Sequence, residues 1–452
     1  EFGDFQTPAE LARGVCQLLA RYGVSPASIV EPTCGIGNLL AAAIEQFPDV
    51  TCALGVEINP KHADQANRRA HSAAHRAAVR VIRGDFFKFD WASTLRGLSD
   101  PMLVLGNPPW VTNSELSVLV SSNVPHKSNF QNHNGLDAIT GKSNFDISES
   151  MLIRLLEHTA GRDATIAMIC KTTVARKVLA HVWRNAIGVE RAQMHLVDAA
   201  RHFRASVDAC FLVFRMSQVA RAKECSVFAD IAATESTHTF GYRDGLLLAN
   251  VKSYERWKHL QGSNGYKWRS GVKHDCAKIM ELRKQESNYR NGLRETVELE
   301  DEYLFPALKS SDLVHNRGLH PRRMMLVTQK VVGEDTYGIE RGAPQTWNYL
   351  LRHADLLDGR SSAIYKKRPR FSVFGVGPYS FAPWKVAISG FYKKVVFDVV
   401  GNVDGKPTML DDTCYFVPCR TESEARYIAS TFNSDIAKQF FECFVFWDAK
   451  RP

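Results

Sequence analysis

Hydrophobic positions in the first 25 residues follow a helical spacing. The apolar stripe consists of Leu11, Val15, Leu18 and Tyr22. Ahead of it, Thr7 is expected as the N-cap, Pro8 at the first helical position and Glu10 as the closing residue of a capping box. Gly23 is a typical helix terminator. The pattern therefore predicts a helix over residues 7–23.

Short apolar runs rich in β-branched residues then alternate with helical patterns. Strands are predicted at SIVEP, TCALGVEI, VRVIRGDFF, PMLVLGN, TIAMICK, AQMHLVDA and DACFLVFRM, and helices at GNLLAAAIEQF, PKHADQANRRAHSAAH, ISESMLIRLLEHT and VARKVLAHVWRNA. Because strands and helices alternate, we expect an α/β fold with a doubly wound, mostly parallel sheet. Only a few residues around Arg204 join the last two strands. These two strands should form an antiparallel hairpin.

After residue 218 the pattern changes to short β-like runs, many turns and interleaved aromatic and basic residues. We place a domain boundary at residues 218–222, which predicts one domain over 1–218 and a second, mixed α+β domain over 219–452. Residues 111–144 contain six Asn and six Ser among 34 positions. A loop of that length in a compact domain is usually functional or disordered, and we expect it to be mobile without its ligand.

Composition indicates a globular protein of the cytoplasm. The chain has 452 residues, of which 45% are hydrophobic, and neither a membrane span nor a secretion signal is indicated. Its ten cysteines occur without a Cys-x-x-Cys motif or the spacing of a zinc site. Reduced thiols and no bound metal are expected.

Charge is unevenly distributed along the chain. Residues 251–400 hold 26 Lys and Arg against 16 Asp and Glu, whereas the whole chain has a net charge of +9. Such a basic segment indicates a polyanionic partner, most commonly nucleic acid. A solvated basic surface without a partner is the alternative.

Three successive strand ends carry groups that suit a nucleoside. EPTCGIGN places Gly35 and Gly37 in a strand-to-helix turn, where a ligand can approach the backbone. Glu57 ends the next strand, where an acidic side chain can accept both hydroxyl groups of a ribose. After the third strand, Asp85 can accept from an adenine amino group and Phe86 can flank the ring. Ordinary strand-terminal turns are the alternative interpretation.

The bound molecule is not expected to be a dinucleotide. Leu40 stands where the third glycine or an alanine of a dinucleotide fingerprint is required. A mononucleoside compound is therefore favoured.

The fourth strand ends in the motif LVLGNPPWV. Two prolines restrict the backbone, so the Asn107 amide oxygen and the Pro108 carbonyl are held as acceptors in a preset geometry. Two rigid acceptors can hold both hydrogens of an aromatic amine and direct its lone pair towards an electrophile, the methyl group of a sulfonium donor. Trp110 offers a ring on which the base can stack. The alternative is that Pro108 and Pro109 merely stop the strand.

FQTP, EPTCGIGN, GVEINP, GDFF and GNPPW, in this order, resemble the S-adenosylmethionine-dependent amino-DNA methyltransferases of restriction–modification systems, in the gamma arrangement of TaqI-like enzymes. The resemblance covers residues 5 to about 217. It implies a Rossmann-like methyltransferase sheet and methyl transfer to N6 of an adenine that is flipped out of duplex DNA.

The resemblance also implies site residues. The donor site it implies consists of Thr7, Pro8, Glu31, Pro32, Gly35, Gly37, Glu57, Ile58, Asp85 and Phe86. Thr7 and Pro8 would lie by the methionine part of the donor, as would Glu31 and Gly35. The catalytic motif it implies is Asn107, Pro108, Pro109 and Trp110. Phe203 would cover the other face of the target base, and a core phenylalanine is the alternative.

This sequence departs from the family at two places. Trp110 stands where the family more often has Tyr, and either Thr33 or Cys34 stands where it often has Ala. A tryptophan preserves the stacking face, so neither departure threatens the chemistry.

The second half resembles the target-recognition domains of these enzymes more loosely. The expected phosphate contacts are Lys366, Lys367, Arg368 and Arg370, beside the aromatic Phe371, Phe374 and Tyr379. A β-sheet core with basic edges is the alternative.

We therefore expect an adenine-specific DNA methyltransferase that uses S-adenosylmethionine and double-stranded DNA and has no membrane partner. The same motif chemistry leaves N4-methylation of cytosine, RNA adenine methylation and methylation of a protein glutamine open. A DNA-binding specificity subunit with an inactive methylase fold is the alternative of another class. Whether a cognate restriction endonuclease is a second partner stays open.

Overall fold

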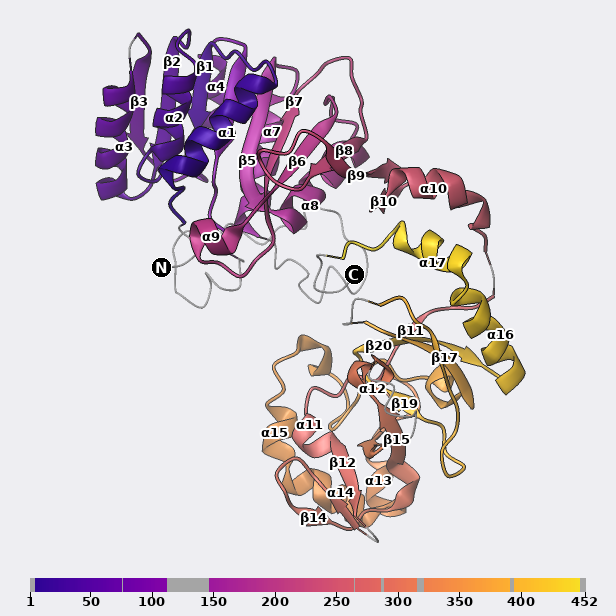
Figure 1. Cartoon of the computed structure of the whole chain (residues 1–452). Coiled ribbons are helices and arrows are strands. Elements are labelled where there is room, and N and C mark those ends of the chain that lie inside the picture. The colour runs from indigo at the N-terminus through magenta and orange to yellow at the C-terminus, as the bar shows by residue number, and fades with distance from the viewer. Residues whose placement is uncertain are drawn as a thin grey trace. The chain divides into compact units, whose positions relative to one another are not determined.

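The computed structural model describes residues 5–74, 76–111, 146–263, 265–285, 288–314, 321–390 and 394–447. The chain divides into two compact units, Glu1–Glu255 and Arg256–Pro452 (Figure 1). The loop expected at residues 111–144 lies, apart from its first residue, outside the described residues.

A ten-stranded sheet forms the centre of the first unit, in the order β10-β9-β8-β6-β7-β5-β4-β1-β2-β3. Its strands are β1 (Ser28–Glu31), β2 (Cys52–Glu57), β3 (Ala78–Arg83), β4 (Met102–Gly106), β5 (Ala164–Lys171), β6 (Ala192–Val197), β7 (Ala209–Arg215), β8 (Glu224–Phe228), β9 (Ser236–Arg243) and β10 (Leu246–Leu248). The strands β3, β2, β1, β4 and β5 run parallel, and β7 lies antiparallel between β5 and β6. The predicted doubly wound sheet with an antiparallel final hairpin is confirmed.

Helices pack on this sheet in two groups. Those of the first unit are α1 (Ala9–Arg21), α2 (Asn38–Gln46), α3 (Pro60–Ala73), α4 (Trp91–Arg96), α7 (Ile147–Thr159), α8 (Thr172–Arg184), α9 (Ala199–Phe203) and α10 (Val251–Trp257), which reaches two residues into the second unit. In one group α2 contacts α1 and α3, and in the other α7 contacts α4 and α8. Figure 1 shows α1, α2 and α3 side by side along the sheet. Because strand order reverses at β1 and β4, right-handed crossovers place the two groups on opposite faces.

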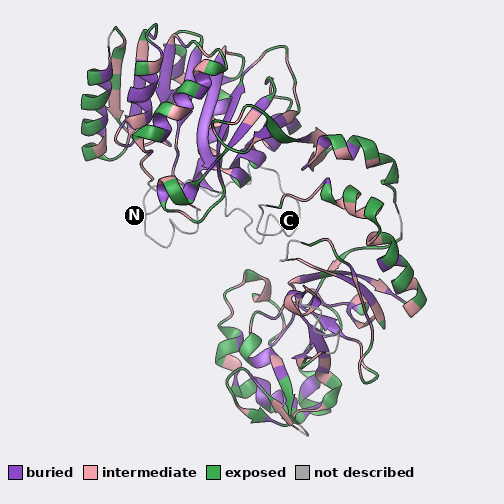
Figure 2. Ribbon diagram, viewed as in Figure 1, coloured by how far each residue is buried: buried purple, intermediate pink, exposed green. Residues whose placement is uncertain are grey.

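The core of the first unit follows the predicted apolar pattern. Every residue of β1 and β4 is buried (Figure 2), as expected for central strands covered on both faces. The helix α1 buries Leu11, Val15, Leu18 and Leu19 against α2 and the strands. All ten cysteines are free, and eight of them are buried.

The predicted start of α1 is wrong. The helix begins at Ala9 with Pro8 as its N-cap, and no side chain caps it. Thr7 is occupied elsewhere, because its hydroxyl oxygen accepts a hydrogen bond from the side-chain nitrogen of Asn107. Glu10 instead pairs with Arg201 on the surface. The end is as predicted, with Gly23 at φ +73° after the last turn.

The first unit ends later than the sequence pattern indicates. Strands β8, β9 and β10 extend the same sheet beyond residues 218–222, since β8 pairs in parallel with β6 and continues into β9 and β10. The compact unit accordingly runs to Glu255. The short β-like runs just after residue 218, which suggested a new domain, complete the first one.

The second unit is mixed α+β, as predicted. It contains a six-stranded sheet, in the order β14-β13-β12-β16-β15-β19, and a four-stranded sheet, in the order β11-β20-β17-β18. The strands are β11 (Arg269–Ser270), β12 (Glu281–Gln285), β13 (Asn288–Arg290), β14 (Thr296–Val297), β15 (Leu304–Leu308), β16 (Arg323–Leu326), β17 (Trp384–Ser389), β18 (Asp398–Val400), β19 (Met409–Leu410) and β20 (Cys414–Cys419). The α-helices are α11 (Ala277–Met280), α12 (Ser310–Val314), α13 (Gly338–Gly342), α14 (Pro344–Arg352), α15 (Ala354–Asp358), α16 (Glu422–Phe432) and α17 (Asp435–Glu442).

None of the helices in the described ranges has both the length and the hydropathy that crossing a membrane requires.

Candidate active site

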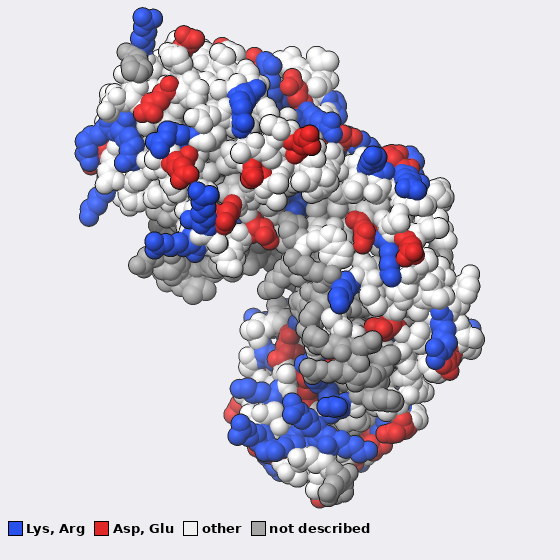
Figure 3. Space-filling model, viewed as in Figure 1, with Lys and Arg blue, Asp and Glu red and all other residues white. Residues whose placement is uncertain are grey.

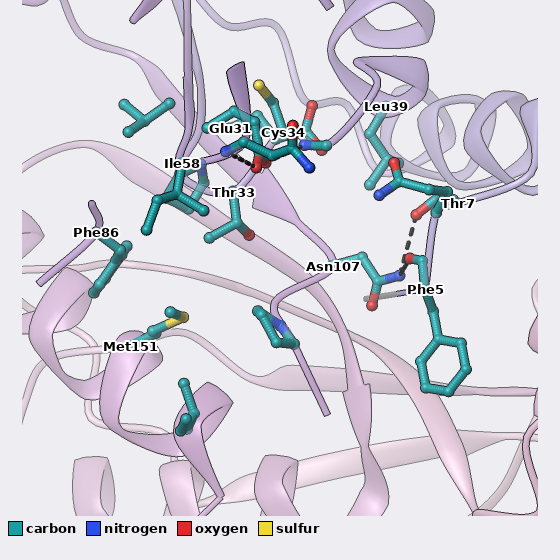
Figure 4. A pocket seen from close by; sticks show the side chains of 18 of the residues that line it. Phe5, Thr7, Glu31, Thr33, Cys34, Leu39, Ile58, Phe86, Asn107 and Met151 are labelled. Carbon is teal, nitrogen blue, oxygen red and sulfur yellow. Dashed lines mark hydrogen bonds between the residues drawn. The ribbon is translucent and has the colours of Figure 1, made fainter. Parts of the chain in front are cut away.

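A cavity of about 310 Å³ opens beyond the carboxyl ends of β1, β2, β3 and β4 (Figure 4). The predicted site residues that line it are Thr7, Glu31, Pro32, Gly35, Glu57, Ile58, Asp85, Phe86, Asn107 and Pro109. Its volume is that of a small-molecule site. Of the residues predicted for the donor and target sites, five do not line it: Pro8, Gly37, Pro108, Trp110 and Phe203.

The glycine turn after β1 is held by two side chains. Gly35, at φ +51°, donates its N–H to Oε2 of Glu57 over 2.8 Å. The next amide, of Ile36, donates to Oε1 of Gln6 over 2.8 Å. A β-carbon at Gly35 would collide with the Gln6 side chain. The left-handed backbone conformation and this close contact together favour glycine at the position.

Gly37 has a packing role. It is the N-cap of α2 at φ +80°, and a β-carbon there would lie 2.7 Å from the Cα atom of Ala66 in α3. The absent side chain allows α2 and α3 to approach each other. Gly37 was predicted in the donor site, whereas the structure places it against a neighbouring helix.

Three carboxyl groups follow one another around the cavity. Glu31 is 2% exposed and accepts from the N–H of Leu40 over 2.8 Å. Burial raises the pKa of Glu31 well above its usual range. Glu57 accepts with both oxygens, from Gly35 and from the N–H of Asn59. Asp85 accepts from the N–H of Phe87 over 2.9 Å. These carboxyl groups are oriented by the backbone before any ligand binds.

Apolar side chains form one end of the cavity. Figure 4 shows Ile58, Phe86 and Met151 there, with Asn107, Thr7 and Phe5 at the other end. Phe86 is buried and its ring packs on Trp91 at a centroid distance of 5.2 Å. A flat ring can therefore bind at this end between fixed apolar surfaces.

Asn107 presents a free oxygen. Its Nδ2 atom donates to the carbonyl of Phe5 over 2.9 Å and to Oγ1 of Thr7 over 3.2 Å (Figure 4). The carbonyl of Phe5 can only accept, so it determines which end of the amide carries the nitrogen. The Oδ1 atom is buried and has no hydrogen-bond partner among the described residues. A buried acceptor without a donor is unfavourable unless a ligand supplies the donor.

Trp110 and Phe203 pack directly on each other. Their ring centroids are 5.0 Å apart with planes at 71°, and Phe5 contacts both rings. A base between two parallel rings needs a separation of roughly 7 Å, twice the contact distance of carbon atoms. Trp110 and Phe203 are 5% and 7% exposed and belong to the hydrophobic core cluster. This arrangement agrees with the alternative interpretation of the sequence, in which Phe203 is a core phenylalanine.

Lys171, a residue that the sequence analysis missed, holds the backbone of the motif. At the end of β5 it donates to the carbonyl of Trp110 over 2.9 Å and to Oδ2 of Asp146 over 2.7 Å. Asp146 also caps α7 through the N–H of Ser148. In the sequence, a lysine directly after the apolar run TIAMIC was the feature from which a charged side chain at this strand end could have been expected.

The predicted phosphate-binding residues lie in the second unit. Lys366, Lys367 and Arg368 are exposed. Arg370 pairs with Asp358 over 2.7 Å, so its charge already has a partner. Phe371 is completely buried in the hydrophobic core and cannot contact a base.

Comparison with known proteins was made by sequence and by structure, and no family model matches the chain. The type II methyltransferase M.NspV of Nostoc sp. is 44% identical over 100% of this chain and 94% of its own length. The type II methyltransferase M.XamI of Xanthomonas campestris pv. amaranthicola is 34% identical over 25% of this chain and 20% of its own length.

Among solved structures, the type IIL restriction–modification enzyme MmeI, in complex with DNA, superposes with a TM-score of 0.53 at 13% identity. The match covers 94% of this chain and 61% of MmeI. At this identity the likeness concerns the fold.

The sheet order defines a Rossmann-like fold, and the strand-end carboxyl groups and the asparagine after β4 lie together around one cavity at its carboxyl edge. Full-length similarity to M.NspV makes the assignment narrower: the chain belongs to the type II methyltransferases, the DNA methyltransferases of restriction–modification systems.

Proposed function

We propose that this chain transfers a methyl group from S-adenosylmethionine to N6 of an adenine in duplex DNA. The observation that carries the proposal is the buried, unpartnered Oδ1 atom of Asn107. It lies at the carboxyl end of β4, beside the strand ends that carry Glu31, Glu57 and Asp85. An acceptor for an amine thus adjoins a cavity whose lining suits a nucleoside.

The lining residues have the chemistry that the donor requires. Glu31 can pair with the ammonium group of the methionine part, and Glu57 can accept from the ribose hydroxyl groups. Asp85 can accept from the adenine amino group, with Ile58 and Phe86 against the ring. When bound, S-adenosylmethionine supplies an electrophilic methyl group on a positively charged sulfur. Thr7, Pro32 and Gly35 complete the donor site that we propose, whereas Pro8 and Gly37 act through the backbone and helix packing.

The target amine is held by the asparagine motif. A base inside the helix stack cannot reach Asn107, so the adenine has to leave the duplex, which requires a few kcal/mol. Oδ1 of Asn107 and the carbonyl of Pro108 then accept one hydrogen bond each from the adenine amino group, and Pro109 restricts the backbone. Trp110 stacks on one face of the base. Phe203 can cover the other face only after the two rings part from their present contact.

Duplex DNA is the proposed partner of the second unit. Its predicted contacts, Lys366, Lys367, Arg368 and Arg370, remain part of this proposal, and residues 219–255 contribute to the first unit. Membership in the type II methyltransferases supports a role beside a cognate restriction endonuclease.

The test is methyl transfer by the purified full chain with labelled S-adenosylmethionine, offered plasmid DNA, RNA or a protein extract. Modified DNA is digested to nucleosides and analysed by mass spectrometry. N6-methyladenine supports the proposal, and N4-methylcytosine overturns the choice of base. Label in RNA or protein alone overturns the choice of substrate. DNA binding without any transfer would indicate a specificity subunit. Asn107→Ala is the matched control.

A further inference from the structure

Three arginines stand in register across the six-stranded sheet of the second unit. Arg283 of β12 lies directly opposite Arg290 of β13 and directly opposite Arg323 of β16. Directly opposite residues project from the same face of a sheet, about 4.8 Å apart in the direction of the hydrogen bonds. The Cα atoms of the three arginines therefore lie on one line across three strands, and their side chains project from the same face of the sheet.

Among the residues that the structure describes, only Arg323 of the three arginines has carboxylate partners. Arg323 pairs with Asp312 over 2.8 Å and with Glu281 over 3.4 Å. Arg283 and Arg290 are exposed, and neither forms an ion pair with any residue that the structure describes. Like charges directly opposite each other destabilise a sheet. The fold thus maintains a repulsive pair that an anion outside the protein can relieve.

Two further cations, Lys278 and Arg294, lie on α11 and on the turn after Arg290, two segments that contact each other. The N–H of Gly292 donates to the carbonyl of Lys278 over 2.8 Å, and a β-carbon on this glycine would lie 2.7 Å from the Cα atom of Lys278. The turn that follows Arg290 therefore packs on α11. Arg294 in this turn is exposed at φ +71°.

Hydrogen bonds of the buried Asn291 side chain hold this turn in place. Its Oδ1 atom accepts from the N–H groups of Leu293 and Glu295, and its Nδ2 atom donates to the hydroxyl of Tyr349. The four cations Lys278, Arg283, Arg290 and Arg294 form what we call the β12–β13 basic surface. Figure 3 shows Lys and Arg side chains gathered over the part of the second unit that carries α11 and β12 in Figure 1.

We propose that the β12–β13 basic surface binds the phosphate backbone of duplex DNA. The inference rests on the proposed function, which makes DNA the substrate, and it assigns the contact to residues outside the segment 366–370. A guanidinium group can donate two parallel hydrogen bonds to the oxygens of one phosphate. A row of such groups on a sheet is therefore preorganised for a polyanion whose phosphates are regularly spaced. Arg370 is neutralised by Asp358, whereas these four residues form no ion pair with a described residue that binding would have to break.

The test compares three full-length variants with the parent chain. The first carries Arg283→Gln and Arg290→Gln together. The control of equal charge change carries Arg420→Gln and Arg426→Gln, two exposed arginines elsewhere in the second unit, of which Arg426 pairs with Glu422 over 2.6 Å. The third carries Lys366→Gln, Lys367→Gln and Arg368→Gln. Duplex binding is measured by fluorescence anisotropy at salt concentrations from about 50 to about 200 mM, the range over which phosphate contacts change affinity most visibly, and donor binding by calorimetry.

We expect the Arg283/Arg290 variant to bind duplex DNA at least tenfold more weakly at the higher salt. The slope of log affinity against log salt should fall by about 0.9 for each phosphate that the variant no longer neutralises. Donor affinity should be unchanged, and the thermal midpoint should stay or rise because a repulsion is removed. The Arg420/Arg426 control should match the parent.

Three results would overturn the inference, and the first two differ in what they imply for the proposed function. If the parent methylates DNA and the Arg283/Arg290 variant binds DNA like its control, the surface assignment is wrong and the proposed function stands. If the parent neither binds nor methylates duplex DNA, both fail together. A loss of binding confined to the variant at residues 366–368 also contradicts the inference.

Discussion

The side-chain nitrogen of Asn107 donates to the backbone carbonyl of Phe5, which lies 102 residues earlier in the sequence, over 2.9 Å. Thr7 accepts a second hydrogen bond from the same nitrogen, and its own carbonyl accepts from Asn38 at the start of α2. The N-terminal segment thus joins the glycine turn beside the donor cavity to the amide that faces the target. Its contacts select the orientation of Asn107 before substrate binds.

Replacing Asn107 by Ala removes the acceptor, together with the hydrogen bonds that its side-chain nitrogen donates to Phe5 and Thr7. We expect donor and DNA affinities close to those of the parent. The rate of the chemical step should fall by roughly 10²–10³, by analogy with the loss of one preorganised polar contact to a transition state. Single-turnover transfer at saturating donor and DNA measures this rate. A rate near that of the parent would mean that the proline pair only stops the strand.

Thr7→Val tests whether Thr7 is a positioning residue. Loss of one neutral hydrogen bond, worth about 0.5–1.5 kcal/mol, should reduce the rate of transfer two- to tenfold while Phe5 still orients the amide. Thr7→Ser retains the oxygen and should restore the rate. kcat and KM for DNA are measured for both variants. A positioning role predicts that Thr7→Val lowers kcat and that Thr7→Ser restores it, whereas a folding defect alone would not change kcat selectively.

Lys171→Met leaves Asp146 without its cation in a site where the carboxylate is only 8% exposed. Breaking such a pair costs about 3–5 kcal/mol, and the carbonyl of Trp110 loses its donor as well. Urea unfolding of the full chain should shift to a markedly lower midpoint. Adding Asp146→Asn should recover part of the loss, because the uncompensated charge disappears. Equal stability of the single and double variants would contradict this account.

Donor binding should depend on pH through Glu31. Burial raises the pKa of this carboxyl group in the free protein, so its neutral form persists above the ordinary range of about 4.3. A neutral carboxyl group cannot pair with the donor's ammonium group, and donor affinity should therefore increase as the pH rises through the raised pKa. Calorimetry over a pH series that extends upward from the ordinary carboxyl range measures the trend. Glu31→Gln should bind more weakly with little dependence on pH, and a variant that retains the parent's pH profile would exclude Glu31 as its source.

Trp110 has both a packing role and a proposed stacking role. Trp110→Ala should destabilise the first unit by about 3–5 kcal/mol through the cavity it creates. It should also weaken binding of the flipped base by roughly 1–3 kcal/mol. Trp110→Phe keeps a flat ring and should retain most activity and stability, because the indole N–H has no partner among the described residues. Thermal unfolding and KM for DNA separate the two effects.

The order of elements and the chemistry at the strand ends could be predicted from the sequence, because both are local. Apolar spacing distinguishes strands from helices, and strands that alternate with helices must run parallel, which brings their carboxyl ends to one edge. For that reason the strand ends alone were enough to expect Glu57, Asp85 and Asn107 together, whereas Glu31 was expected from the resemblance to the methyltransferase family. The end of the first unit could not be predicted, since strands β8, β9 and β10 are recognised as part of the sheet only by their pairing with β6.

Contacts between distant segments were decided by the tertiary structure alone. Thr7 has the sequence of a helix cap but contacts Asn107, and Lys171 reaches the carbonyl of Trp110 from another strand. The arginines of the β12–β13 basic surface become neighbours only through the register of their strands. Hydrogen bonds and like-charge pairs depend on separation in space, which the spacing along a chain does not determine. The sequence by itself determined which chemical groups are available, and folding determined which of them meet.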